Sequence, residues 1–119
     1  MSRAMDERRL ETADGRVVAA HVELAQTTWR RFMGLMFRRE LPAGHGLALS
    51  PCNSIHMFFM RIPLDVVFLD REGAVLRVYD GLRPWRVSRI VRGARTAVEL
   101  PAGTLREAGV EQGTVLRLA

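Results

Sequence analysis

Three side chains that could take part in chemistry lie within one stretch, Cys52–Asp70, which reads CNSIHMFFMRIPLDVVFLD. The only cysteine, Cys52, is four residues from His56, and Asp65 lies further along. On a helical turn, a thiol and an imidazole at this spacing could act as nucleophile and base. On an extended strand they would lie about 13 Å apart, too far for proton transfer. The spacing alone leaves both arrangements open, so His56, Asp65 and Cys52 are candidate catalytic residues to which no role is assigned.

Asp65 is the most constrained of these groups, because apolar residues flank it on both sides. Burying an unpaired carboxylate is very costly, so Asp65 needs a cation or backbone N–H groups as its partner. Arg61 and Arg38 are the candidate cations. Asp65 is then a structural ion pair or backbone anchor, a ligand contact, or a base that acts with His56.

Other kinds of site find little support in the sequence. The three histidines form no HxH or HxxxH pair and the carboxylates are spread along the chain, so we predict no metal site. No glycine-rich phosphate loop and no G-x-S-x-G motif occur, and we predict no cofactor. A single cysteine excludes an internal disulfide and zinc sites built on several thiolates.

The elements that must position these residues are mainly strands. Residues 64–69 (LDVVFL) are apolar on both sides, which predicts a central strand covered on both faces. A turn at Arg71–Gly73 predicts a hairpin with a following strand. The same criteria predict strands over 17–24, 46–50, 74–79, 94–100 and 114–118, and a surface loop over 82–93.

Two short helices complete the prediction. The first begins at Thr27 or Thr28 and runs to about Phe37, with an apolar stripe that we expect to face the core, and Gly34 within it suggests close approach by another segment. The second covers Thr104–Glu107, whose sequence has the form of a capping box, with Gly109 at the position after the helix. The stripe consists of Trp29, Phe32, Met33 and Met36.

A chain of 119 residues fits one domain, which we expect to span residues 13–119 behind a flexible, charged lead-in at 1–12. The first residues lack an apolar signal-peptide region, and apolar runs are too short to cross a bilayer, so a cytoplasmic protein is expected. The net charge is +5, the pI is near 11.1, and all 18 basic residues are arginines. The arginines at 83, 86, 89, 92 and 95 build a clean face on neither a helix nor a strand, which makes nucleic-acid binding unlikely by this criterion.

Three sequence blocks give the chain its resemblance to a prokaryotic family catalogued as "domain of unknown function 192". They are Arg31–Arg38 with Leu41-Pro42 and Gly46-Leu47 after it, Ile55–Asp70, and a block from Ala94 through Pro101 to Gly113. The resemblance implies a compact β-sandwich or jelly-roll-like barrel of about six or more strands, mainly β within the α+β class. It implies no activity. Many members of that family carry Trp-Met-Lys-Asn-Thr where this chain has His56–Met60.

Three functional hypotheses follow. The first is a non-enzymatic binding or accessory domain, with a partly apolar groove between residues 29–37 and 52–65 that takes a small molecule or peptide, and with His56, Arg61, Asp65 and Arg38 as polar contacts. The second is a hydrolase or isomerase that uses His56 with Asp65 or Cys52. The third is an arginine-based nucleic-acid binder.

Overall fold

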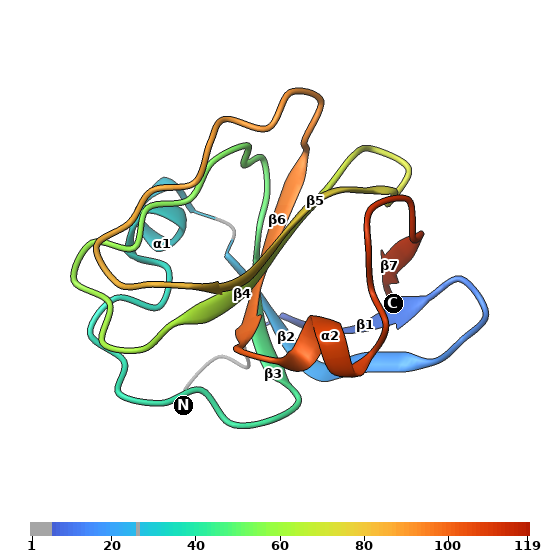
Figure 1. The fold of residues 1–119 in the computed structure, drawn as a ribbon, viewed down its shortest axis with the longest axis horizontal. Coiled ribbons are helices and arrows are strands. Elements are labelled where there is room, and N and C mark those ends of the chain that lie inside the picture. The colour runs from blue at the N-terminus through green and yellow to red at the C-terminus, as the bar shows by residue number, and fades with distance from the viewer. Residues whose placement is uncertain (1–5, 26) are drawn as a thin grey trace.

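One curved sheet of seven strands forms the fold of this computed structural model, which describes residues 6–25 and 27–119 (Figure 1). In chain order the strands are β1 (Glu7–Thr12), β2 (Val17–Ala25), β3 (His45–Leu49), β4 (Leu64–Leu69), β5 (Val75–Leu82), β6 (Thr96–Pro101) and β7 (Leu116–Leu118). Two short helices, α1 (Thr28–Met33) and α2 (Thr104–Glu107), accompany them. The prediction of a mainly β domain with two short helices is confirmed.

The strands follow the order β5-β4-β6-β3-β2-β1-β7, and only β2 and β3 run parallel. The sheet curls until its two edges meet: Ala74, just before β5, forms a bridge with Val115, just before β7. The Leu116 N–H also donates to the Gly73 carbonyl at 2.9 Å. The architecture is therefore barrel-like, with one short contact between its edge strands.

The amino-terminal segment corrects one prediction. Residues 7–12, expected to be part of a flexible lead-in, form β1 and pair with both β2 and β7. Leu10, the only apolar residue of this strand, is fully buried, and Glu11 and Thr12 beside it are buried as well, so the second half of the strand is part of the core. Residues 1–5 of the expected lead-in lie outside the described part of the chain.

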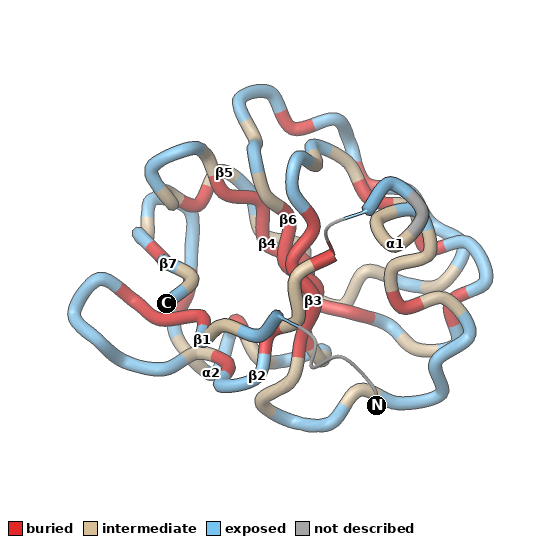
Figure 2. Tube along the Cα trace, turned by 180° about the vertical axis from the view of Figure 1, so that it is seen from behind, coloured by how far each residue is buried: buried red, intermediate tan, exposed pale blue. Residues whose placement is uncertain are grey.

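Two apolar clusters lie on opposite faces of the central strands β3, β4 and β6, which contain buried segments (Figure 2). One fills the barrel and includes Leu105 of α2; the other lies beneath α1 and the loops at 50–63 and 83–95. All six residues of β4 are buried, because Val67 and Leu69 face the first cluster while Leu64, Val66 and Phe68 face the second. The prediction that this strand is central and covered on both faces is confirmed.

Helix α1 is shorter than predicted. Thr27 caps it by accepting from the Arg30 N–H at 2.9 Å, as expected, but the helix ends at Met33 because Gly34 has φ +51° and ψ −126°. Of the predicted core stripe, Phe32 is 55% exposed, and the side chain of Trp29 lies outside the described part of the structure. The stripe is therefore not a core face at Phe32.

Helix α2 has the predicted end but a different beginning. Gly103, not Thr104, occupies the cap position, and no side chain of the helix caps it. At the other end, the Val110 N–H reaches the Leu105 carbonyl and Gly109 has φ +69°, which is the expected left-handed stop.

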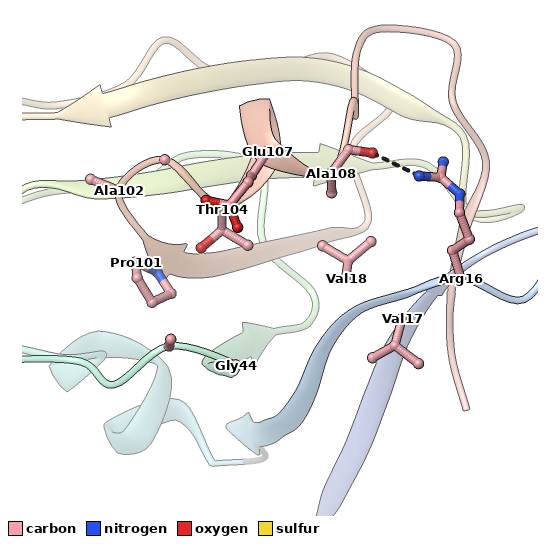
Figure 3. Close-up of a pocket in the computed structure, with 11 residues that line it drawn as sticks. Arg16, Val17, Val18, Gly44, Pro101, Ala102, Thr104, Glu107 and Ala108 are labelled. Atoms are coloured by element: carbon pink, nitrogen blue, oxygen red, sulfur yellow. Dashed lines mark hydrogen bonds between the residues drawn. The ribbon is translucent and has the colours of Figure 1, made fainter.

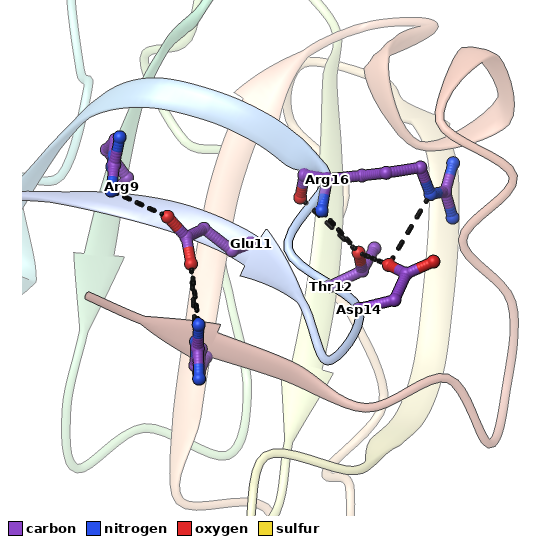
Figure 4. A network of polar contacts seen from close by, with 6 residues as sticks. Arg9, Glu11, Thr12, Asp14 and Arg16 are labelled. Atoms are coloured by element: carbon purple, nitrogen blue, oxygen red, sulfur yellow. Dashed lines mark hydrogen bonds and ion pairs between the residues drawn. The ribbon is translucent and has the colours of Figure 1, made fainter.

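Charged side chains at the amino-terminal strands are largely paired with one another (Figure 4). Glu11, which is 5% exposed, contacts Arg9 at 3.0 Å and Arg117 of β7 at 3.1 Å. In the β1–β2 turn, Asp14 accepts from the Thr12 hydroxyl and lies 3.6 Å from Arg16. This end of the molecule is nearly charge-balanced by its own residues.

Candidate functional site

Asp65 is fully buried and acts as an anchor for backbone segments. Its Oδ1 accepts from the Gly81 N–H at 2.9 Å, and its Oδ2 accepts from Gly103 at 3.0 Å and Leu105 at 2.9 Å. These bonds place the carboxylate where a helix cap would stand, which is why α2 needs no cap of its own. Among the described residues no cation pairs with Asp65, and both Arg61 and Arg38 are exposed.

His56 is held by backbone groups at both ring nitrogens. Its Nδ1 accepts from the Phe58 N–H at 3.2 Å, so Nε2 carries the proton and donates to the Phe32 carbonyl at 3.1 Å. Its backbone forms a bridge with Val87. No hydrogen bond to Asp65 or Cys52 is found in the described residues, so the structure does not assemble the pairs that an acid–base or nucleophilic role would need.

Cys52 lacks the features of an activated thiol. It donates a hydrogen bond to the Ser54 carbonyl at 3.1 Å. Burial raises the pKa of the thiol, and the nearby carboxyl of Glu99 raises it further, against a smaller lowering by Ser54 and Arg31. A thiol that resists ionisation is a poor nucleophile.

The buried group that sequence reasoning missed is Glu99. It lies in the middle of β6, between Leu47 of β3 and Val66 of β4, on the sheet face that α1 and the loops cover. The side chain is 4% exposed, and its Oε1 has no hydrogen-bond partner among the described residues. Buried carboxyls without a partner are rare in proteins, which marks this one as a candidate for function.

Desolvation governs the protonation of Glu99. Burial raises the pKa of Glu99 from its ordinary value of 4.5 to about 8, although the charge of Arg30 acts in the opposite direction. Arg30 is engaged elsewhere, because it donates to the Gly34 carbonyl at 2.6 Å and pairs with Glu23 at 3.1 Å. At neutral pH the Glu99 carboxyl is therefore protonated, with one O–H to donate and oxygen lone pairs to accept.

Glu99 lines a cavity of about 40 Å³, which we call the Glu99 pocket. Its wall opposite the sheet is the turn after α1, where a Cβ on Gly34 would lie 3.5 Å from Oε1 of Glu99. The close approach predicted for Gly34 is thus made by the Glu99 side chain. The remaining lining comes from Leu49 of β3 and from the segments 31–36 and 52–60, including Cys52, Ser54 and His56.

The sequence contains only a weak signal for Glu99: a carboxylate in the run Ala97-Val98-Glu99-Leu100, which otherwise predicts a buried strand. One-sided exposure of an antiparallel strand would explain that pattern equally well. What decides the matter is that segments 31–36 and 52–60, distant in sequence, cover the outer face of the sheet.

A larger hollow of about 590 Å³ lies at the opposite end, between the β1–β2 turn and α2 (Figure 3). Its polar residues include Arg16, Thr104 and Glu107. The Arg16 guanidinium already donates to the Ala108 carbonyl at 3.3 Å, and both Arg16 and Glu107 are exposed. Because none of its charged groups is buried, this hollow has less to offer a specific ligand than the Glu99 pocket.

Two features are absent from residues 6–25 and 27–119. No helix there is long and apolar enough to cross a membrane. No three His, Cys, Asp or Glu side chains of that part of the chain come together as metal ligands would.

Comparison with known proteins places the chain among sequences of unassigned activity. The family described as "DUF192: Uncharacterized ACR" matches residues 9–118. A UPF0127 protein of Thermococcus gammatolerans is 39% identical over 106 residues, which are 86% of this chain and 69% of that protein. A UPF0127 protein of Pyrococcus furiosus is 33% identical over 109 residues, or 87% of this chain and 91% of the relative.

Two crystal structures share the fold. A protein of Sinorhizobium meliloti 1021, provisionally described as a transcription regulator, superposes with a TM-score of 0.82 at 28% identity, covering 99% of this chain and 98% of that one. A protein of unknown function from Novosphingobium aromaticivorans has the same TM-score at 23% identity, covering 95% and 84%.

Proposed function

The chain belongs to the uncharacterised DUF192 family, and we propose that it is a non-enzymatic binding domain that takes an uncharged polar group of a small molecule or peptide into the Glu99 pocket. The observation that carries the proposal is a carboxyl that belongs to a residue only 4% exposed, has an oxygen without a hydrogen-bond partner among the described residues, and lies in the lining of a cavity. A buried polar atom left without a partner costs about 1–3 kcal/mol, which a bound ligand would recover.

The protonation state of Glu99 selects the ligand chemistry. A protonated carboxyl offers a donor and an acceptor side by side, which matches a primary amide or an alcohol. A cationic group is disfavoured, because Arg30 already lies near enough to act on Glu99 and Arg31 lines the pocket. The small volume, enough for one or two water molecules, restricts entry to the end of a ligand.

The rest of the ligand would extend over Cys52. A second hollow of about 170 Å³ is lined by Pro51, Cys52, Asn53 and Ala94, and it shares Cys52 with the Glu99 pocket. The proposed site thus coincides with the groove expected between residues 29–37 and 52–65. It differs in its central polar group, because Glu99 takes the place given to Asp65.

The structure favours this reading over an enzyme that uses His56. Both nitrogens of His56 are bonded to backbone groups, and the pKa of the Cys52 thiol is raised rather than lowered. A general base needs a free nitrogen within reach of its partner, and a nucleophilic thiol needs a low pKa.

A pair of substitutions tests the proposal. Glu99→Gln keeps a donor and an acceptor in the pocket, whereas Glu99→Met keeps the size and removes both. We expect short-chain primary amides to raise the Tm of the wild-type protein and of Glu99→Gln, and to leave the Tm of Glu99→Met unchanged. In the wild-type protein the shift should disappear above about pH 8, where the carboxyl loses its proton.

Glu107→Gln is the matched control, because Glu107 is an exposed residue of α2 at the other end of the molecule. Primary amides should raise the Tm of this variant as they do that of the wild type. Equal amide-induced shifts in the wild-type and Met proteins, or no shift in any of them, would show that Glu99 is not a ligand contact.

A further inference from the structure

Six aromatic rings follow one another across the surface formed by α1, the turn after it and the loops at 50–63 and 83–95. We call them the aromatic face: Phe32, Phe37, His56, Phe58, Phe59 and Trp85. Neighbouring ring centres lie 4.9–6.2 Å apart, from Phe32 through His56 and Phe58 to Trp85, and on through Phe59 to Phe37. The four phenylalanines and Trp85 are 42–58% exposed. Contiguous exposed apolar rings of this kind mark an interaction surface.

Three of these rings belong to residues with a strained backbone conformation. Phe37, Phe59 and Trp85 have φ values of +68°, +62° and +70°, a region that bulky residues rarely adopt. Local hydrogen bonds maintain the geometry: the Phe37 N–H donates to the Phe59 carbonyl at 3.0 Å, and the Trp85 N–H donates to Met57 at 2.7 Å. Strain of this type concentrates at functional sites, and here it serves to present rings to solvent.

The same loops carry a strong excess of positive charge. Residues 31–63 and 83–95 contain nine of the 18 arginines and a single acidic residue, Glu40. These arginines are Arg31, Arg38, Arg39, Arg61 and every third residue from 83 to 95. None of them forms an ion pair with another described residue, whereas the ion pairs that occur involve β1, β2, α1, β7 and the turn near Arg16.

The spacing of three that argued against a basic face does not apply to the observed conformation. Residues 83–95 are neither a helix nor a continuous strand, and all five of their arginines are exposed. The loop runs alongside residues 53–57, with bonds from Ser88 to Ile55 and from Val91 to Asn53 (Figure 1). An irregular loop can therefore bring the arginines and the aromatic face to one side of the molecule.

We propose that the aromatic face binds single-stranded nucleic acid, with bases stacking on the rings and phosphates contacting arginines of the same segments. Single-strand binders combine stacking aromatic side chains with positive charge that follows the backbone, and here aromatic rings and nine arginines occur in segments whose single acidic residue is Glu40. Arginine is also the side chain best suited to phosphate. An anionic bilayer would favour an apolar helix lying in its surface, but α1 has six residues and the rings are only half exposed.

Fluorescence anisotropy with a labelled oligothymidylate of about 12 nucleotides tests this proposal. We expect binding whose log K falls linearly with log salt, by about 0.7 for each phosphate contact. Trp85→Asn removes one ring and tolerates the positive φ, and it should weaken binding about tenfold or more. Replacing both Arg83 and Arg86 by Ala should reduce the salt slope by about 1.4.

Arg106→Ala is the control, because Arg106 is exposed on α2, away from the aromatic face. It should leave the affinity unchanged, and circular dichroism should show every variant folded. Absence of binding at low salt, equal binding to the duplex of the same sequence, an unaffected Trp85→Asn variant, or binding only to phosphatidylglycerol vesicles in a flotation assay would each overturn the proposal. The Glu99→Met variant should bind the oligonucleotide normally, so the two proposed sites are tested separately.

Discussion

The protonated state of Glu99 makes the stability of the domain fall as the pH rises. Below pH 4.5 the carboxyl is protonated in both the folded and the unfolded chain, so it contributes no pH dependence. Between 4.5 and about 8 the unfolded chain releases the proton while the folded chain keeps it. The folded state then binds more protons than the unfolded state, and the free energy of unfolding decreases with increasing pH.

The size of the effect follows from the shift. One pKa unit corresponds to about 1.4 kcal/mol, so a folded pKa of about 8 against 4.5 removes about 3 kcal/mol of stability at pH 7 and about 4 kcal/mol at pH 8, with a limit of about 5 kcal/mol at higher pH. Glu99→Gln is neutral at every pH and escapes this loss. We therefore expect the variant to exceed the wild-type protein in stability by an amount that grows from pH 4.5 to pH 8.

Urea unfolding followed by tryptophan fluorescence across this pH range measures the difference directly. Subtracting the free energies of unfolding of the two proteins cancels the titration of all other groups. The corresponding difference for Glu107→Gln, a substitution of an exposed glutamate, should not grow with pH. A difference that is constant with pH, or that reverses sign, would mean that Glu99 is ionised and paired in the folded state, and the reasoning would be refuted.

Three other substitutions or treatments probe the framework of the fold. Asp65→Asn should lower the free energy of unfolding by about 2 kcal/mol or more in urea titrations, because one of two oxygens that serve three backbone N–H groups becomes a donor. Iodoacetamide at pH 8 should alkylate Cys52 at least about tenfold more slowly than glutathione, and at the same rate once the chain is unfolded in urea. Gly73→Ala should prevent the edge contact between β5 and β7, since its Cβ would lie 2.1 Å from the Leu116 carbonyl oxygen; loss of amide protection at Leu116 in hydrogen exchange would report this, and a wild-type pattern would contradict it.

Local sequence patterns were sufficient for much of the fold. The strand 64–69 was predicted with its observed bounds, because a run that is apolar at every position but one has few alternatives in a domain of this size. The stop of α2 at Gly109 was also predictable, since a left-handed glycine followed by an apolar residue is a local motif. These features depend on neighbours in the chain.

Features that depend on distant contacts were missed. The capping box at Thr104 was outcompeted by Asp65, which is 40 residues from Leu105 and supplies the cap from another strand. The exposure of Phe32 and the burial of Glu99 were likewise hidden, because both follow from how the loops cover the outer face of the sheet. Of the site residues named from the sequence, Cys52 and His56 line the Glu99 pocket, Asp65 is buried in the sheet, and Arg38 and Arg61 are exposed; the central group of the pocket, Glu99, could be found only in the folded structure.

The burial of β4 on both faces has a consequence for folding specificity. A strand that is apolar on one side can pair in one register only, because a shift by one residue turns its apolar side chains to water. Leu64–Leu69 would lose little apolar contact by such a shift, because an apolar cluster lies on each face of the strand. Asp65 removes the ambiguity: only in the observed alignment does its carboxylate meet the N–H groups of Gly81, Gly103 and Leu105. The one charged residue in the strand thus encodes which of two near-equivalent pairings the chain adopts.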